Sequence, residues 1–463
     1  MATRDSRAGL ASRDFALLLI ATFGVFTSYA PLLSVAPMWV THGGAASGAA
    51  GAATGVTMAA TVAAQLCVPR LHRRLGFRTI LAAGALVLGA PAFGYALSAS
   101  AGWVLAVSAV RGLGFGMVTV AGSALVAELV PAAGQGRAVG WYGMAVGLPQ
   151  VLFLPLGVWA ARHVGFTVVF TVAGAAGVVA APLTMAIRPG RAAPRPVPGP
   201  SPGVDGHAPR GPVSPVGAAR RRGLAPPWLL MITAGCALGG ITAFIPLRFA
   251  ALAAAPASLF LMSAAVVAGR WAAGSWSDRA GGRHLLVSGV TACALGLAGL
   301  AAAVFGVTTL ILPGAALYGL GLGAVQNDTL VIMFRRAGPG GYGAASTAWN
   351  IAVDAGTGIG ATAIGWGSDL LGLGGAFAVC AALIAALTPV ALRIRARERP
   401  PLDAHDVHDP RDAQDTRDAR DPRDRRDSRD SRDSRDSRYA AQLPADDPDV
   451  CGNRHRGPFS ETE

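Results

Sequence analysis

The chain has 463 residues, of which 52% are hydrophobic and only 14% are charged. So little charge excludes an ordinary water-soluble enzyme of this length and favours a helical membrane bundle. The formal net charge of +13 comes from arginine alone, because no lysine occurs; these arginines are spread over many short connections, which argues against a nucleic-acid-binding patch.

Apolar stretches of about 20 residues, each long enough to cross the hydrocarbon core of a bilayer, follow one another along the chain. They predict an all-α integral membrane protein with twelve transmembrane helices. The polar residues 1–14 are expected to be a retained cytoplasmic tail rather than a signal peptide. The predicted spans are residues 15–39, 47–68, 79–99, 103–128, 139–161, 166–187, 228–249, 257–276, 285–305, 309–333, 343–367 and 373–394.

Arginine is concentrated in every second connection between these spans. This alternation follows the positive-inside rule and places both termini in the cytoplasm of a multi-pass protein of the plasma (inner) membrane. Most arginines before residue 400 lie in residues 1–14, 70–78, 188–222, 279–283, 335–336 and 393–399. None lies in 40–46, 99–102, 306–308 or 368–372, and Arg162 and Arg248 are the only exceptions to the alternation.

Two segments lie outside the spans. Residues 188–227 are rich in Pro and Gly and are predicted to be a flexible cytoplasmic linker between two six-helix halves, 15–187 and 228–394. Residues 395–463 contain "RDARDPRDRRDSRDSRDSRDSR", which is expected to be disordered because it has no apolar face. A regulatory role for this tail stays open beside that of a tolerated disordered segment.

The two predicted halves repeat three short patterns in register. "RLGFR" (74–78) lies over "RAGGR" (279–283) at an offset of 205 residues. "RGLGFG" (111–116) lies over "YGLGLG" (318–323), and "GMAVG" (143–147) over "NIAVD" (350–354), both at an offset of 207. A parallel repeat of two halves is an architecture of membrane transporters, which place the substrate site between the halves.

Several of these patterns resemble the major facilitator superfamily. "GSWSDRAGGR" (274–283) is similar to its G-x-L-x-D-R-x-G-R-R signature, with Gly274, Asp278, Arg279, Gly281 and Arg283 in its functional places. The earlier copy, "PRLHRRLGFR" (69–78), departs from the signature at its acid, where Arg73 stands. "RGLGFG" resembles the R-x-x-x-G motif of the fourth span, and residues 143–157 resemble the fifth-span motif of proton antiporters, with Leu148 inserted before Pro149. The resemblance covers about residues 15–395 and implies a transporter similar to bacterial proton-coupled drug-efflux permeases.

The charged turns are candidates for gating on the cytoplasmic face. Asp278 can accept hydrogen bonds from a helix N-terminus, which by the resemblance is that of the fifth span. Arg279 and Arg283 can bind acids or helix C-terminal carbonyls in one conformation only, although a purely topogenic role stays open for Arg283. In the first half Glu128 is a candidate partner for Arg74 or Arg78.

Charges within the bilayer are costly unless they face a cavity or a partner, and they are therefore the first candidates for substrate and proton contacts. Asp354 lies about 16 Å into its span and Arg111 about 12 Å, and Asn350 shares a helical face with Asp354. A structural Asp–Arg pair, such as Arg270 with Asp328 or Asp354, is the alternative. The candidates are Asp354, Asp328, Arg111, Asn350, Asn327 and Gln326.

Neither a phosphate-binding loop after a strand nor a hydrolase or metal-ligand motif occurs, so we expect no enzyme activity, no cofactor and no metal. The sequence favours a monomeric secondary transporter that exports a small, partly apolar organic molecule in exchange for protons. A proton-coupled uptake permease for a sugar or organic acid is the alternative within transport. A non-transporting membrane sensor or scaffold is the alternative from another class.

Overall fold

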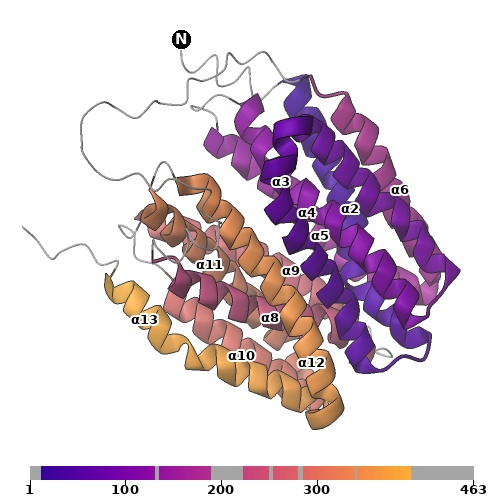
Figure 1. The fold of residues 1–463 in the computed structure, drawn as a ribbon. Helices are drawn as coiled ribbons and strands as arrows, with labels where there is room; N and C mark the ends of the chain where they lie inside the picture. Colours follow the sequence, from indigo (N-terminus) through magenta and orange to yellow (C-terminus); the bar gives the residue numbers. More distant parts are fainter. Residues whose placement is uncertain are drawn as a thin grey trace, which may run out of the picture. The chain divides into compact units, whose positions relative to one another are not determined.

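A computed structural model of the protein describes residues 12–130, 135–188, 223–249, 254–279, 285–338 and 341–397. These residues are almost entirely helical (Figure 1). Within them, ten helical stretches are long and apolar enough to cross a membrane. The Arg/Asp-rich run and most of the Pro/Gly-rich segment lie outside the described residues.

Two of the ten stretches are too long for one crossing. Ser47–Leu97 has 51 residues and Gly343–Ala396 has 54, whereas about 20 residues suffice for a bilayer. Each contains one glycine with positive φ, Gly76 (φ 71°) and Gly372 (φ 70°), at which the helical backbone is interrupted. A positive φ is accessible to glycine because it has no Cβ. Each stretch therefore provides two crossings, and the described part of the chain has the twelve transmembrane helices that the sequence predicts.

The connection at 70–78 lies within helix α3 (Ser47–Gly89), and only Gly76 leaves the helical conformation there. The helices also run further than the hydropathy indicates, because polar and Gly-rich turns at their ends still complete the backbone hydrogen bonds. Thus α5 covers Gln135–His163 and α8 begins at Ala225.

The helices form two groups, which Figure 1 shows in indigo to magenta and in pink to orange. The first group comprises α2 (Arg13–His42), α3 (Ser47–Gly89) with the 3-10 helix η1 (Ala90–Leu97), α4 (Ala101–Leu129), α5 and α6 (Phe166–Met185). The second comprises α8 (Ala225–Arg248), α9 (Ala254–Arg279), α10 (Leu286–Val304), η3 (Thr308–Leu310), α11 (Ile311–Ala337), α12 (Tyr342–Ala386) and α13 (Thr388–Arg397).

The same glycine-mediated helix crossing occurs in both groups. In the first, Gly112 and Gly116 of α4 lie against the backbone carbonyls of Thr57 and Thr61 of α3, so closely that a Cβ would overlap them. In the second, Gly319 and Gly323 of α11 lie in the same way against Met262 and Val266 of α9. The glycines are 207 residues apart and the carbonyls 205, the offsets found in the sequence. Small residues permit this close approach of helices in membranes.

The connections define two ends of the bundle. At the arginine-poor end, which contains residues 43–46, 98–100, 164–165 and 305–307, Trp39 Nε1 donates to the carbonyls of Tyr95 (2.8 Å) and Ser98 (3.1 Å). At the arginine-rich end, which contains residues 70–78, 186–188 and 335–338, Arg78 donates to the Ile187 carbonyl at 3.0 Å. Both contacts tie helices of the first group together at their ends.

The two groups meet closely near the arginine-poor end. Ser34 Oγ of α2 donates to the buried Thr242 carbonyl of α8 at 2.7 Å, and Arg162 of α5 donates to the Pro246 carbonyl. Gly51 of α3 packs against the backbone of α12 at Ala361. The contact at Gly51 brings α3 and α12 together and thereby positions the polar residues that lie further along both helices.

Candidate functional site

Arg111 lies inside the first group of helices, as its place in an apolar span predicts. Only 3% of its surface is exposed, and its guanidinium donates to the Leu88 carbonyl at 2.6 Å and the Ser28 carbonyl at 3.0 Å. The guanidinium carbon Cζ of Arg111 lies 5.8 Å from the centre of the Tyr95 ring, within the range of a cation–π contact. Backbone carbonyls and an aromatic face thus replace an acid as its partners.

The second group repeats one of these contacts with a neutral residue. Tyr318 stands 207 residues after Arg111, and its hydroxyl donates to the Ala234 carbonyl of α8 at 2.8 Å. Ala234 is on the helix that corresponds to α2, which carries Ser28. The bridge from α4 or α11 to the first helix of each half is therefore structural, and the positive charge of Arg111 is additional to it.

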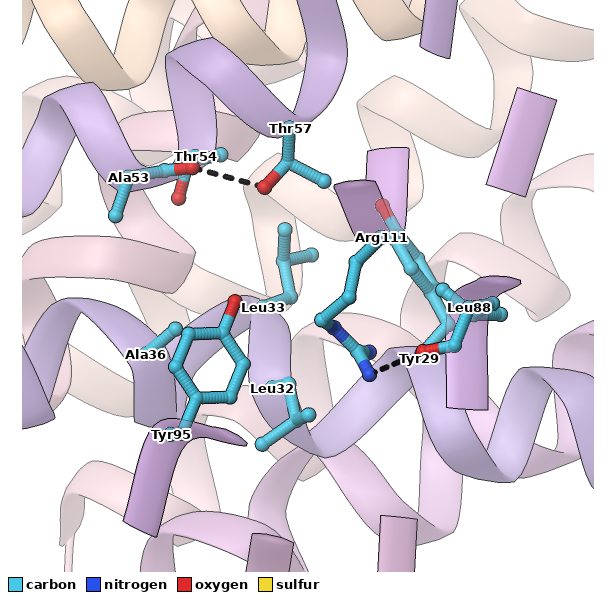
Figure 2. A pocket seen from close by; sticks show the side chains of 10 residues that line it. All are labelled: Tyr29, Leu32, Leu33, Ala36, Ala53, Thr54, Thr57, Leu88, Tyr95 and Arg111. Atoms are coloured by element: carbon cyan, nitrogen blue, oxygen red, sulfur yellow. Dashed lines mark hydrogen bonds between the residues drawn. The ribbon is translucent and has the colours of Figure 1, made fainter. Parts of the chain in front are cut away.

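Arg111 also lines a small cavity of about 20 Å³ in the first group. Figure 2 shows the Arg111 side chain reaching across this space and the Tyr95 hydroxyl directed into it. Tyr29 stacks on Phe115 with ring centres 3.8 Å apart, which fixes the position of its ring. Thr54 Oγ1 is buried there and forms no hydrogen bond. The cavity is lined by Tyr29, Leu32, Leu33, Ala36, Ala53, Thr54, Thr57, Leu88, Tyr95 and Arg111.

Asp354 is the second intramembrane candidate, and it joins the two groups. It is 9% exposed on α12, and its Oδ2 accepts a hydrogen bond from Nε2 of Gln65 on α3 at 2.6 Å. The same Gln65 nitrogen lies 3.2 Å from Thr119 Oγ1 of α4. Gln65 itself is fully buried, and its Oε1 accepts no hydrogen bond. Its partnership with Asp354 makes Gln65 part of the candidate site.

Gln65 was not among the residues predicted from the sequence. A single neutral amide in the run "TMAATVAAQLCVP" is a weak signal, and no periodicity indicates which other helix it meets. The signal that could have found it is its position in the repeat. Gln65 stands 205 residues before Arg270, which the sequence predicted as a candidate for a structural pair with an Asp.

A polar cluster occupies the second group. Arg270 of α9 donates to Gln326 Oε1 of α11 at 3.4 Å and lies 5.9 Å from the ring centre of Trp349 of α12. Trp349 Nε1 in turn donates to Thr329 Oγ1 at 3.1 Å. Gln326 and Trp349 are buried, at 7% and 8% exposure, whereas the side chain of Arg270 is exposed. The contacts found for Arg270 are thus with neutral groups.

Asp328 and Asn327 lie next to this cluster but have local partners. Asp328 accepts from Asn327 Nδ2 at 3.3 Å and from the backbone of Leu285, the residue that precedes α10. A carboxylate that accepts a hydrogen bond at a helix N-terminus stabilises that end of the helix. Asn350 likewise binds within its own helix, since its Nδ2 donates to the Ser346 carbonyl at 2.9 Å.

The predicted gating residues are distributed over the arginine-rich end. Arg78 binds the Ile187 carbonyl, and Arg74 and Glu128 are exposed. The hydrogen bond found for Arg78 therefore goes to a helix end of its own half rather than to Glu128. Asp278 and Arg279 form the last turn of α9, their side chains lie outside the described part, and Arg283 lies outside the described residues.

Chemically, the arrangement offers charged and hydrogen-bonding contacts to a proton or a ligand. Across the described ranges, no three His, Cys, Asp or Glu side chains come together as a group that could hold a metal ion. What the site does contain is one buried carboxylate at the junction of the halves and a guanidinium in each half. Such intramembrane charges are typical of ion and substrate pathways.

Comparison with known proteins identifies the fold. The family model of the Major Facilitator Superfamily matches residues 18–361. A bacterial homolog of the human lysosomal transporter Spinster, in an inward-facing and unoccupied conformation, has a similar structure, with a TM-score of 0.66 and 15% sequence identity. The similarity covers 84% of this chain and 98% of that one. No curated protein matches the chain by sequence.

Two other solved structures have the same fold. The nucleoside transporter NupG has a TM-score of 0.63 at 12% identity, covering 83% of this chain and 99% of its own. A D-xylose-proton symporter has a TM-score of 0.59 at 14% identity, covering 81% and 98%. At such identities the likeness concerns the fold, and substrates do not follow from it.

Proposed function

The chain belongs to the major facilitator superfamily, and from this premise we propose that it is a proton-coupled secondary transporter. It moves a small, partly apolar organic molecule by alternating access, as its two halves rock about a site between them. The observation that carries the proposal is the hydrogen bond between Gln65 and Asp354, which joins the halves inside the membrane.

The unequal hydrogen bonding of Gln65 supports proton coupling at this contact. Its Nε2 donates to Asp354, but its Oε1 is buried and accepts nothing. A protonated Asp354 carries an O–H that can donate to this oxygen, whereas an ionised one has none to offer. Because an unsatisfied buried acceptor is costly, the contact is best satisfied when Asp354 binds a proton. Separation of the halves would hydrate Asp354 and release that proton.

The contacts near the arginine-poor end support a state that is closed on that side. Ser34 binds Thr242 and Arg162 binds Pro246 across the two halves. The positive-inside rule assigns the arginine-poor end to the outside. We therefore propose that this conformation takes up its substrate from the cytoplasm. Asp278, Arg279 and Arg283 would act in the opposite conformation, in which the arginine-rich end closes.

We propose export as the direction, because residues 143–157 resemble the fifth-span motif of proton antiporters. The second candidate is proton-coupled uptake, which is favoured by the likeness to a D-xylose-proton symporter. Both directions use the same site. In export the proton and the substrate cross the membrane in opposite directions, and in uptake they cross in the same direction. The plasma membrane as location, cytoplasmic termini and a monomeric state belong to the same proposal.

Flux measurements test this proposal. The purified full chain is reconstituted in vesicles that contain a pH-sensitive dye, and a panel of organic cations, anions, sugars and nucleosides is added. A transported compound moves protons when it is added, and a collapsed proton gradient abolishes its accumulation. Opposite movement of compound and proton supports export, and parallel movement supports uptake. A panel compound that is carried with no proton movement contradicts the coupling.

A further inference from the structure

Gln65 and Arg270 are equivalent residues in the two halves. They are 205 residues apart, the same offset as between Thr61 and Val266 of the helix crossing. Their partners also correspond, because Gln65 binds Thr119 and Arg270 binds Gln326, which stand 207 residues apart. The two side chains therefore project from the same place on α3 and α9.

Across the junction, however, the two residues meet different surroundings. Gln65 reaches Asp354 of α12. The residue equivalent to Asp354 in the first half is Gly147 of α5, 207 residues earlier. A Cβ at Gly147 would meet only Val267, at 3.8 Å, which lies about one helical turn before Arg270 on α9. Gln65 thus has a carboxylate as its partner across the junction, whereas Arg270 has glycine at the equivalent position.

The guanidinium is held in place but not neutralised. Gln326 accepts one of its hydrogen bonds, and the Trp349 ring lies beside it. Among the described side chains, no carboxylate lies within ion-pairing distance of Arg270. Its exposed surface remains open to a ligand, unlike the buried Gln326 and Trp349. A cation within a membrane bundle calls for a partner or a hydrated cavity.

We propose that Arg270 binds an anionic group of the transported molecule, in the space that Gly147 leaves opposite it. The substrate then carries a carboxylate or a similar planar anion, since a guanidinium binds such groups through two parallel hydrogen bonds. Trp349 and Val267 provide an aromatic and an aliphatic surface for the apolar body of the same molecule. This inference rests on the proposed transport function and narrows it to organic anions.

The substitution that tests the geometry is Gly147→Asp. It places a carboxylate where the repeat has Asp354 and supplies Arg270 with an internal partner. Gly147→Ala is the matched control, because it adds the Cβ without the charge. Arg270→Gln removes the charge while keeping a hydrogen-bond donor for Gln326. Arg270→Lys keeps the charge but lacks the two parallel N–H donors of the guanidinium.

Binding is measured with benzoate and its neutral isostere benzamide on the full chain in phosphatidylcholine nanodiscs, by tryptophan fluorescence and calorimetry. We expect benzoate to bind about tenfold more tightly than benzamide, the effect of one charge-assisted contact. The preference should weaken in Arg270→Lys and vanish in Gly147→Asp and Arg270→Gln, and Gly147→Ala should retain more of it than Gly147→Asp. Thermal unfolding checks that each variant is folded.

Equal binding of benzoate and benzamide to the unaltered chain, or a full preference in Arg270→Gln, overturns the inference. Repeating the titration with added phosphatidylglycerol separates substrate from lipid: if this lipid displaces benzoate, the anion site belongs to a headgroup and the inference is wrong. Because binding requires no flux, the preference can hold while proton-coupled transport fails, and the two proposals are distinguished.

Discussion

Gln65 of the first half donates a hydrogen bond of 2.6 Å to Asp354 of the second, and both side chains are buried. It is a contact between two polar side chains that bridges the halves deep within the bundle. Its strength depends on the protonation of Asp354, because only the protonated acid can also donate to the unsatisfied oxygen of Gln65.

Asp354→Asn should abolish the coupling of transport to protons while leaving downhill exchange of the substrate intact. The asparagine amide keeps an acceptor and a donor for Gln65 but cannot ionise. Proton movement on substrate addition, measured in reconstituted vesicles, checks this. Asp369→Asn is the matched control, because Asp369 lies on the same helix but is exposed. Unchanged coupling in Asp354→Asn would transfer the role to Asp328.

Gln65→Leu should favour the conformation in which the arginine-poor end opens. Loss of the donor leaves Asp354 buried without this partner, which costs about 1–3 kcal/mol and shifts the equilibrium by about 5- to 150-fold. Spin labels at the exposed residues Val164 and Leu370 report the distance between the halves at that end. A longer distance in the variant is expected, and an unchanged distribution would show that the contact does not bias the equilibrium.

Gly323→Ala should destabilise the fold, because its Cβ would overlap the Val266 carbonyl and force α9 and α11 apart. Overpacking of this kind costs about 1–3 kcal/mol. Gly143→Ala is the control, since nothing lies within 4 Å of its added Cβ, and replacing a helical glycine there is neutral or stabilising. Thermal unfolding in detergent compares the two, and equal midpoints would contradict the role of the crossing.

Asp278→Asn should slow transport while leaving insertion and abundance near normal, because it weakens the contact proposed for Asp278 when the arginine-rich end closes. Arg73→Asp should strengthen closure of that end, because it restores an acid where a helix N-terminus is expected. Initial rates of flux, normalised to the amount of protein in the membrane, measure both effects. An unaltered rate in Asp278→Asn would leave the turn with a topogenic role alone.

A reporter enzyme fused after Arg222 or at the C-terminus should be cytoplasmic, and one inserted near Gly43 should be external. The arrangement of arginines underlies this expectation. Paired reporters, one active only inside and one only outside the cell, give the answer directly. An external signal from the Arg222 fusion would reverse the orientation and with it the side from which the substrate enters.

The sequence by itself determined the helices, their number and the repeat. Hydrophobic length fixes where a chain crosses a bilayer, since no unsatisfied backbone is tolerated there. The register of the two halves was also readable, and the structure reproduces its offsets of 205 and 207 residues at Gly116–Thr61 and Gly323–Val266. Arg111 and Asp354 were identifiable as candidates because charge is so rare within these spans.

Only the tertiary structure decided which polar groups meet. The partnership of Asp354 with Gln65 joins residues 289 positions apart, and it depends on how closely glycine-rich faces let α3 and α12 approach. Arg270 contacts Gln326 and Trp349 rather than the acids that its charge suggested. Local hydropathy indicates how deep each residue lies in the membrane. It does not indicate how its helix is rotated or at what angle it crosses its neighbours, and these two quantities determine which polar residues come into contact.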